Sequence, residues 1–280
     1  DFAHRLGRRL GVDGARLFPY ADPESIFNEH RESTRGRDLD ITGLSYAVLV
    51  QAGPQQWPYP TGAAGGKIRL YEDGVFPTPD GKARFVTVDH APTAEQTDAA
   101  TPISLLSGRL RDHWHGMSRT GTVPRLFNLD DEPQLAMHPC DMRHRGLRSG
   151  DLVRVSNARG ELAVRVIERP GLKKGRAWMP MHWGSQFMNS PGVNAVACAA
   201  VDPHSRQPEL KHAAVQITRL DLPYPVTVIR RCADQAAARR LLQAVRPLLA
   251  NFPYATVGLY GRQSALVLLR AASALPLDDT

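Results

Sequence analysis

The stretch SGRLRDHWHGMSR, residues 107–119, gathers the side chains of this chain that are best suited to chemistry. His113 and His115 flank a tryptophan, and two arginines precede them. Such side chains can build a metal centre, an acid–base pair or a binding site for an anion. The spacing argues against a metal. On a strand the two histidines share one face, but no nearby Cys or His completes the four ligands of a structural zinc site.

An acid–base pair between Asp112 and His113 stays open as an alternative, although no nucleophile turn accompanies it. An anion site fits the pattern best. A strand that leaves through Ser107 and Gly108 lets backbone amides approach a ligand, and each arginine that follows can make two parallel hydrogen bonds to an oxyanion. The aromatic side chains offer flat faces to a purine or pterin ring.

The composition is that of a soluble globular protein. Hydrophobic residues make up 42% of the 280 residues, and no apolar run approaches the roughly 18 residues of a membrane helix. The formal net charge of +7 comes mainly from arginine. The basic residues are scattered, so we expect neither nucleic acid nor a membrane as a partner, and the cytoplasm as the location. The three cysteines, Cys140, Cys198 and Cys232, predict no disulfide framework and no metal motif.

Residues 1–99 are expected to hold two or three short helices followed by an extended connector. Asp22 is a predicted N-cap, and Gly53 ends a second helical segment. The connector is rich in Pro and Gly, and its strand candidates are confined to residues 67–71 and 83–88.

Residues 100–219 consist mostly of strand patterns and predict a β-barrel with small helical inserts, one of which begins at Pro139 and ends just before Gly146. The phrase GLRSG at Gly146 recurs as GLKKG at Gly171, each time before a strand. The repetition favours a barrel of two related halves, with chance similarity of two turns as the alternative. Residues 220–280 predict a small α+β unit whose helix covers one sheet face, and we expect this unit to be truncated.

The segment LLSGRLRDHWHGMSRTGTVPRL resembles the opening of the cofactor-binding domain of molybdopterin oxidoreductases, and of assimilatory nitrate reductases in particular. Other segments resemble the same enzymes in the same order, namely FNEHRESTRGRDLDITGLSY, FPTPDGKARF, AWMPMHWGSQF and VNAVACAAVDPHSRQPELKHAAVQI. The resemblance runs from residue 1 to about residue 219. It implies a mainly β fold with α+β additions, in which residues 1–99 end a preceding domain and residues 100–219 form a double-psi β-barrel of the aspartate-decarboxylase type.

The resemblance further implies that this region holds part of a bis-molybdopterin guanine dinucleotide. An amide at Asn194 suits a pterin or guanine edge, and an ammonium at Lys211 suits pyrophosphate. Met181 falls where periplasmic nitrate reductases place a phenylalanine near the substrate, with His182 and Trp183 as further lining. The positions carried over as cofactor-binding are Ser107, Gly108, Arg109, Leu110, Arg111, Asp112, His113, Trp114, His115, Gly116, Asn194 and Lys211.

By the same resemblance, the whole enzyme would reduce nitrate to nitrite in nitrate assimilation. The family's [4Fe-4S] cysteine motif and its molybdenum-ligating cysteine lie upstream of this region, so we expect this portion to be inactive alone and to hold no catalytic residue. Its partners would be the rest of the nitrate reductase chain and an electron-donor protein or reductase subunit. The alternatives are a formate dehydrogenase or another molybdopterin oxidoreductase, and a stand-alone double-psi barrel that acts as a binding module.

Overall fold

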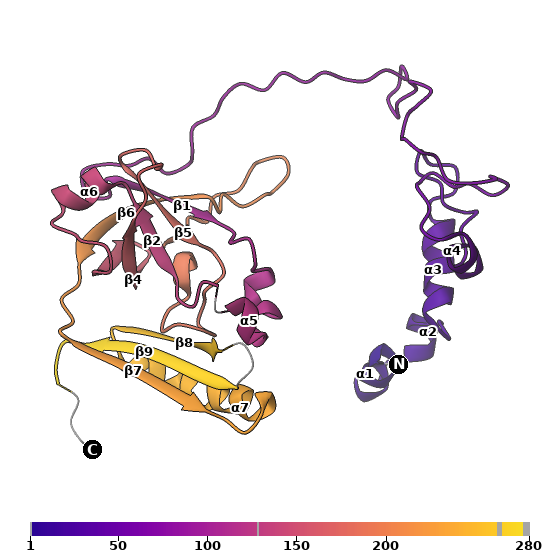
Figure 1. The fold of residues 1–280 in the computed structure, drawn as a ribbon. Helices are drawn as coiled ribbons and strands as arrows, with labels where there is room; N and C mark the ends of the chain where they lie inside the picture. The colour runs from indigo at the N-terminus through magenta and orange to yellow at the C-terminus, as the bar shows by residue number, and fades with distance from the viewer. Residues whose placement is uncertain (1, 128, 262–264, 277–280) are drawn as a thin grey trace. The chain divides into compact units, whose positions relative to one another are not determined.

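The structure, a computed structural model, describes residues 2–127, 129–261 and 265–276. The chain divides into two compact units, Asp1–His90 and Ala91–Thr280, and each is described by itself (Figure 1). The finer division at residues 99 and 219 stays a prediction. No helix in the described ranges is long and apolar enough to cross a membrane.

The first unit contains short helices around a small core. Asp22 accepts a hydrogen bond from the Ser25 amide at 2.8 Å, which confirms the predicted N-cap. Gly53, with φ of 74°, ends a helix as expected. A cluster of Ile41, Leu44 and Tyr59 is buried beneath these helices. The helices are α1 (Phe2–Arg9), α2 (Gly14–Leu17), α3 (Pro23–Glu32) and α4 (Tyr46–Ala52).

The two strand candidates of the connector are wrong. Residues 67–71 form bends and turns, and residues 83–88 are extended without a strand partner. Phe85 is 97% exposed and Val88 is 85% exposed. An alternating pattern makes a strand only where a neighbouring chain supplies hydrogen bonds, and here none is adjacent.

The second unit is built around a closed six-stranded barrel with the strand order β1-β5-β2-β4-β3-β6. The barrel prediction is therefore confirmed, as is the insert α6 (Pro139–His144), which Gly146 follows with φ of 64°. β2 was not expected, because four residues show too little alternation to read as a strand. The strands are β1 (Ile103–Gly108), β2 (Gln134–Met137), β3 (Leu152–Asn157), β4 (Gly160–Glu168), β5 (Arg176–Pro180) and β6 (His212–Arg219).

The strand pairing has an internal symmetry. β1 pairs with β5 and β2 pairs with β4 in parallel, and the other neighbours are antiparallel. Exchanging β1 with β4, β2 with β5 and β3 with β6 reproduces every one of these pairings, so the barrel consists of two related halves. The repeated glycine turns, GLRSG and GLKKG, do not correspond to these two halves. They precede β3 and β5, and the exchange does not relate these two strands to each other.

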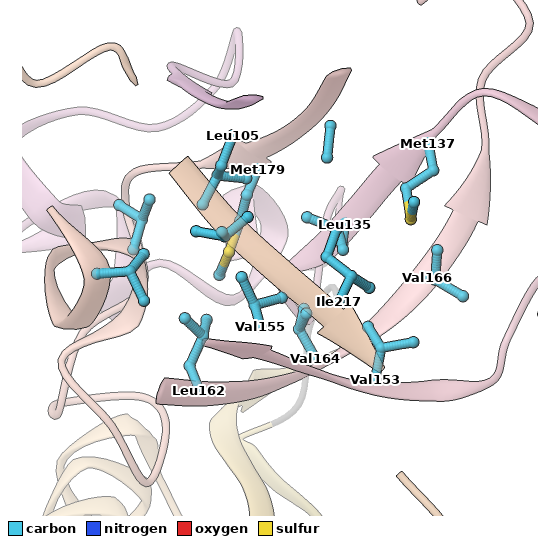
Figure 2. Close-up of a cluster of buried hydrophobic side chains, with 14 of the residues drawn as sticks. Leu105, Leu135, Met137, Val153, Val155, Leu162, Val164, Val166, Met179 and Ile217 are labelled. Carbon is cyan, nitrogen blue, oxygen red and sulfur yellow. The ribbon is translucent and has the colours of Figure 1, made fainter. Parts of the chain in front are cut away.

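The barrel interior is filled by alternate residues of its strands, as Figure 2 shows for Val153, Val155, Leu162, Val164 and Val166. Successive side chains of a strand point to opposite faces, so a period of two sends each of these inward. All five are at most 3% exposed. Burial of each such side chain contributes about 1.5–3 kcal/mol to stability.

The carboxy-terminal elements form a sheet with the order β7-β9-β8, from β7 (Tyr224–Arg231), β8 (Tyr254–Tyr260) and β9 (Leu266–Ser273). The expectation of one buried sheet face is wrong. The helix α7 (Gln235–Val245) covers one face through a cluster that includes Val257. The opposite face buries Tyr254 and Ala272 against Leu152 and Ala163 of the barrel (Figure 1).

Gly258 of β8 touches the ring of Phe127 at the end of α5 (Pro124–Phe127), and an added Cβ would overlap that ring. We expect Gly258→Ala to lower the free energy of unfolding by about 1–3 kcal/mol, because the packed ring cannot make room. Gly171→Ala is the matched control, since nothing lies within 4 Å of its Cβ position. Urea unfolding measures both, and equal midpoints would contradict this packing.

Candidate functional site

The predicted anion-binding stretch begins where β1 leaves the barrel. Ser107 is paired with Met179 of β5, and on the other side β1 pairs with β6 as far as His212. The Ser107 hydroxyl donates a hydrogen bond of 2.5 Å to the carbonyl of Leu210. Lys211, whose side chain is exposed, therefore lies beside the strand exit, so the structure brings these two predicted residues together.

Gly108 is required by packing against a neighbouring strand. A Cβ at this position would lie 2.7 Å from the indole Nε1 of Trp178. The Gly108 carbonyl accepts a hydrogen bond of 2.9 Å from the amide of Met181. Met181 is half-buried and thus sits at the same exit. The space that the glycine frees is taken by the tryptophan.

His182 anchors the chain just beyond the exit. The Leu110 amide donates a hydrogen bond of 2.9 Å to Nε2 of His182, which is 4% exposed. Because Nε2 accepts, the ring carries its proton on Nδ1 and is neutral. Burial, together with the nearby charges of His113 and Arg109, lowers the pKa of His182 to about 4.

His113 is buried rather than displayed. It is 3% exposed, and its Nδ1 lies 3.0 Å from the hydroxyl of Thr120. Its ring packs edge-on against His182 and Trp183, with centroids 5.6 and 5.5 Å apart. Burial lowers the pKa of His113, while the carboxylate of Asp130 opposes the change. The arrangement indicates that His113 holds the loop in place.

The shared face expected for the two histidines does not form. Residues 109–114 are not a strand, and His115 is exposed while His113 is buried. The pairing of Asp112 with His113 is also not formed, because the Asp112 carboxylate binds Arg111, with Oδ2 and Nη2 3.0 Å apart. Among the described residues, no group of three or more His, Cys, Asp or Glu side chains is placed to hold a metal ion.

The exposed part of the stretch carries a cation and an aromatic face. The Arg109 guanidinium lies 4.2 Å from the ring centroid of Trp114, which is 53% exposed. The positive charge of Arg111 is balanced by Asp112, whose carboxylate accepts hydrogen bonds from the guanidinium. Within the described ranges, Arg109 and Lys211 form no ion pair. Both cations are therefore available to an anionic ligand at the strand exit.

The turn that ends the stretch is strained. His115, Gly116 and Met117 follow one another with φ of 44°, 58° and 60°. The left-handed region costs a residue other than glycine about 1–2 kcal/mol. Full burial of Met117 and a hydrogen bond of 2.8 Å from its amide to the Trp114 carbonyl offset this cost. The turn buries Met117 and leaves Trp114 facing outward.

Asn194 is exposed on the short helix η3 (Gly192–Val196), which a separate network holds. Arg159 donates a hydrogen bond of 2.8 Å to the Val196 carbonyl and binds both carboxylate oxygens of Glu95, at 2.7 and 2.9 Å. Glu95 also accepts a hydrogen bond of 2.7 Å from the Ala214 amide of β6. One carboxylate thus ties the segment of Asn194 to the strand that begins just after Lys211.

Sequence reasoning missed most of these anchoring residues. His182 was expected to line a funnel, whereas its ring accepts a backbone hydrogen bond. Glu95 and Arg159 carry no local signal, because an acidic residue in a connector and an arginine in a hairpin turn are ordinary in both places. Thr120 is equally inconspicuous. Only the distant partner reveals each role.

Comparison with known proteins matches residues 103–214 to the family described as "Molydopterin dinucleotide binding domain". The chain is 37% identical to a nitrate reductase of Klebsiella oxytoca over 221 residues, and this alignment covers 76% of this chain and 25% of that protein. It is 36% identical to a nitrate reductase of Synechocystis sp., over 76% of this chain and 30% of that protein. It is 30% identical to the assimilatory nitrate reductase catalytic subunit of Bacillus subtilis, over 78% of this chain and 29% of that protein.

The chain thus spans about a quarter to three tenths of the length of these curated relatives. Among solved structures, acetylene hydratase from Pelobacter acetylenicus aligns with a TM-score of 0.49 and 18% sequence identity. That alignment covers 78% of this chain and 32% of the hydratase.

His182 should make the stability of this protein depend on pH. Its folded pKa of about 4 is below the ordinary value of 6.5, so the unfolded chain binds the proton first. The stabilisation is complete above pH 6.5 and is lost as the pH falls from 6.5 to 4. His182→Gln keeps an acceptor but removes the titrating ring, and we expect urea unfolding to depend less on pH across this window. His144→Gln changes an exposed histidine and is the control; an equal pH dependence in both variants would exclude this role.

The Glu95 network should contribute more to stability than an exposed ion pair. We expect Glu95→Gln to lower the free energy of unfolding by about 1.5–3 kcal/mol, because several hydrogen bonds to a charged group are weakened. Glu161→Gln is the matched control, since its side chain is 62% exposed and lies 3.5 Å from Arg154; we expect it to change stability by at most about 1 kcal/mol. Similar losses in the two variants would refute the anchoring role of Glu95.

Proposed function

We propose, from the match of residues 103–214 to the molybdopterin dinucleotide-binding domain family, that this chain is the carboxy-terminal part of a molybdenum-dependent nitrate reductase. The observation that carries the proposal is this match together with 30–37% identity to three nitrate reductases. The whole enzyme would reduce nitrate to nitrite. The Bacillus subtilis relative, an assimilatory catalytic subunit, supports a role in nitrate assimilation.

We further infer that the barrel belongs to the double-psi class. The exchange of β1–β3 with β4–β6 supports this assignment, because a double-psi barrel consists of two interlocked halves that are related in this way. Its parallel pairs, β1 with β5 and β2 with β4, are the pairs that the exchange interchanges. Strand β1 then leaves the barrel at one end of the half formed by β1–β3.

The residues at the β1 exit fit a bis-molybdopterin guanine dinucleotide. Arg109 and Lys211 offer positive charge without a carboxylate partner in the described part of the chain, which suits pyrophosphate oxygens. Trp114 offers an exposed ring beside Arg109. When bound, the cofactor supplies the molybdenum centre at which nitrate loses an oxygen atom in a two-electron reduction. The protein orients the cofactor.

The other residues predicted to contact the cofactor would contribute to its binding in different ways. Ser107 and His113 are buried, so they fix the loop, while Arg111, Asp112, His115 and Gly116 lie on its outer side. Asn194 would contribute an amide from η3 to a pterin or guanine edge. Met181, hydrogen-bonded to the strand exit, is the proposed substrate-side residue.

The remaining parts of the proposal concern the complete protein. A [4Fe-4S] cluster and the molybdenum ligand would be supplied by a region upstream of these residues, so this portion would be inactive alone. Electrons would come from a donor protein or reductase subunit. A cytoplasmic location and the absence of nucleic-acid or membrane partners agree with an assimilatory role.

The experiment is to express the complete protein and to measure nitrite formation with a reduced viologen donor. Nitrite formation that requires molybdenum is the expected result. Molybdenum-loaded protein that makes no nitrite would refute the nitrate assignment, and activity on formate instead would point to the related dehydrogenases. Correctly folded protein that takes up no molybdopterin would favour the alternative, a stand-alone binding module.

Arg109→Gln tests the cofactor contact. Loss of a charged hydrogen bond to phosphate costs about 1.5–3 kcal/mol, roughly a tenfold or greater loss of affinity. We therefore expect lower molybdenum content per purified protein and lower nitrite formation in proportion. Arg125→Gln, an exposed arginine on α5, is the control and should retain both. Unchanged molybdenum content in Arg109→Gln would exclude this contact.

A further inference from the structure

A cavity lies within the Ala91–Thr280 unit, between the barrel inserts and the carboxy-terminal sheet. Its volume is about 100 Å³. One wall comes from η1 (His115–Met117) and η2 (Thr120–Thr122), and the other from α7, η4 (Arg246–Asn251) and β8. The lining residues are Met117, Ser118, Gly121, Thr122, Gln186, Phe187, Arg239, Leu242, Gln243, Arg246 and Leu259.

The cavity has an apolar floor and a polar rim. Met117, Phe187, Leu242 and Leu259 are at most 5% exposed and form the floor. The rim is built largely by one side of α7 and the first residue of η4, where residues 239, 243 and 246 are spaced by four and three positions. This side presents two guanidinium groups and one amide to the opening.

The two arginines of this rim lack anionic partners. Neither Arg239 nor Arg246 forms an ion pair with any residue that the structure describes. Arg239 makes one long hydrogen bond, 3.4 Å to the Thr122 carbonyl. The Nε of Arg246 is buried without an acceptor, while its guanidinium lies 5.9 Å from the ring centroid of Phe187. The positive charge of these two guanidinium groups is therefore not balanced by a carboxylate of the described residues, and an anionic ligand would supply one.

We propose that this cavity binds a small monocarboxylate with a short apolar tail. The carboxylate would accept hydrogen bonds from Arg246 and Arg239, for which the guanidinium geometry is suited. The tail would cover the apolar floor and remove it from water. A phosphate would leave the apolar floor exposed to water, and a neutral apolar molecule would leave the guanidinium groups without an anion. Neither ligand would therefore complement both the floor and the rim of the cavity.

This site does not depend on the proposed function, because its lining shares no residue with the predicted cofactor contacts. It does adjoin them. Met117, which directly follows the Ser107–Gly116 stretch and is the last of three consecutive left-handed residues, forms part of the cavity floor. A bound carboxylate would therefore rest against the base of that loop.

The test is saturation-transfer difference NMR on the complete protein with 3-methylbutanoate as the probe. We expect a saturable signal, no saturable signal from the neutral 3-methylbutanamide, and no displacement of the probe by equimolar inorganic phosphate. Arg246→Met keeps an aliphatic side chain and removes the charge, so it should weaken binding at least tenfold. Arg240→Met on α7 is the matched control, because Arg240 is an exposed arginine that does not line the cavity.

Equal binding in the Arg246→Met and Arg240→Met proteins would overturn the proposal, as would displacement of the probe by phosphate alone. Should Arg246→Met unfold, Arg239→Met removes the second rim charge from an exposed position and should also weaken binding. Cofactor content and nitrite formation play no part in these measurements, so their outcome is separate from that of the proposed function.

Discussion

Closure of the barrel is the constraint on which the candidate site depends. β1 is hydrogen-bonded on one side to β5 and on the other to β6, so its path is fixed until it leaves at Gly108. The hydroxyl of Ser107 adds a bond to the Leu210 carbonyl just before β6. An open sheet would leave this strand free at one edge. The closed ring instead brings two segments that are distant in sequence to one place.

The loop beyond this exit is shaped by two buried, neutral histidines. The His182 ring accepts a backbone hydrogen bond, and His113 binds Thr120 while its ring packs against Trp183. Both rings are kept neutral by burial, which lowers their pKa values. With these groups fixed, the loop can hold left-handed residues at His115 and Met117 and still leave an arginine and a tryptophan facing outward.

The carboxy-terminal sheet serves as a second layer on the barrel. Tyr254 is fully buried between them and donates a hydrogen bond of 2.5 Å to Glu132, and Arg270 pairs with Asp131 at 2.8 Å. Burial raises the pKa of Tyr254, so its phenol remains a donor. This docking also brings α7 to the inserts of the barrel. The cavity lined by residues of both layers lies where they meet.

The sequence by itself determined the local features. Apolar runs and alternating patterns located five of the six barrel strands, a Pro and a Gly bounded α6, and the stretch from Ser107 to Gly116 indicated the candidate site. These features depend on residue type and spacing within a few positions. Tertiary structure alone decided the rest: the strand β2, the burial of His113 beside an exposed His115, the second buried face of the sheet, and the partners of Glu95 and His182. Each of these features depends on a residue that is distant in the sequence, and a local sequence pattern does not identify that partner.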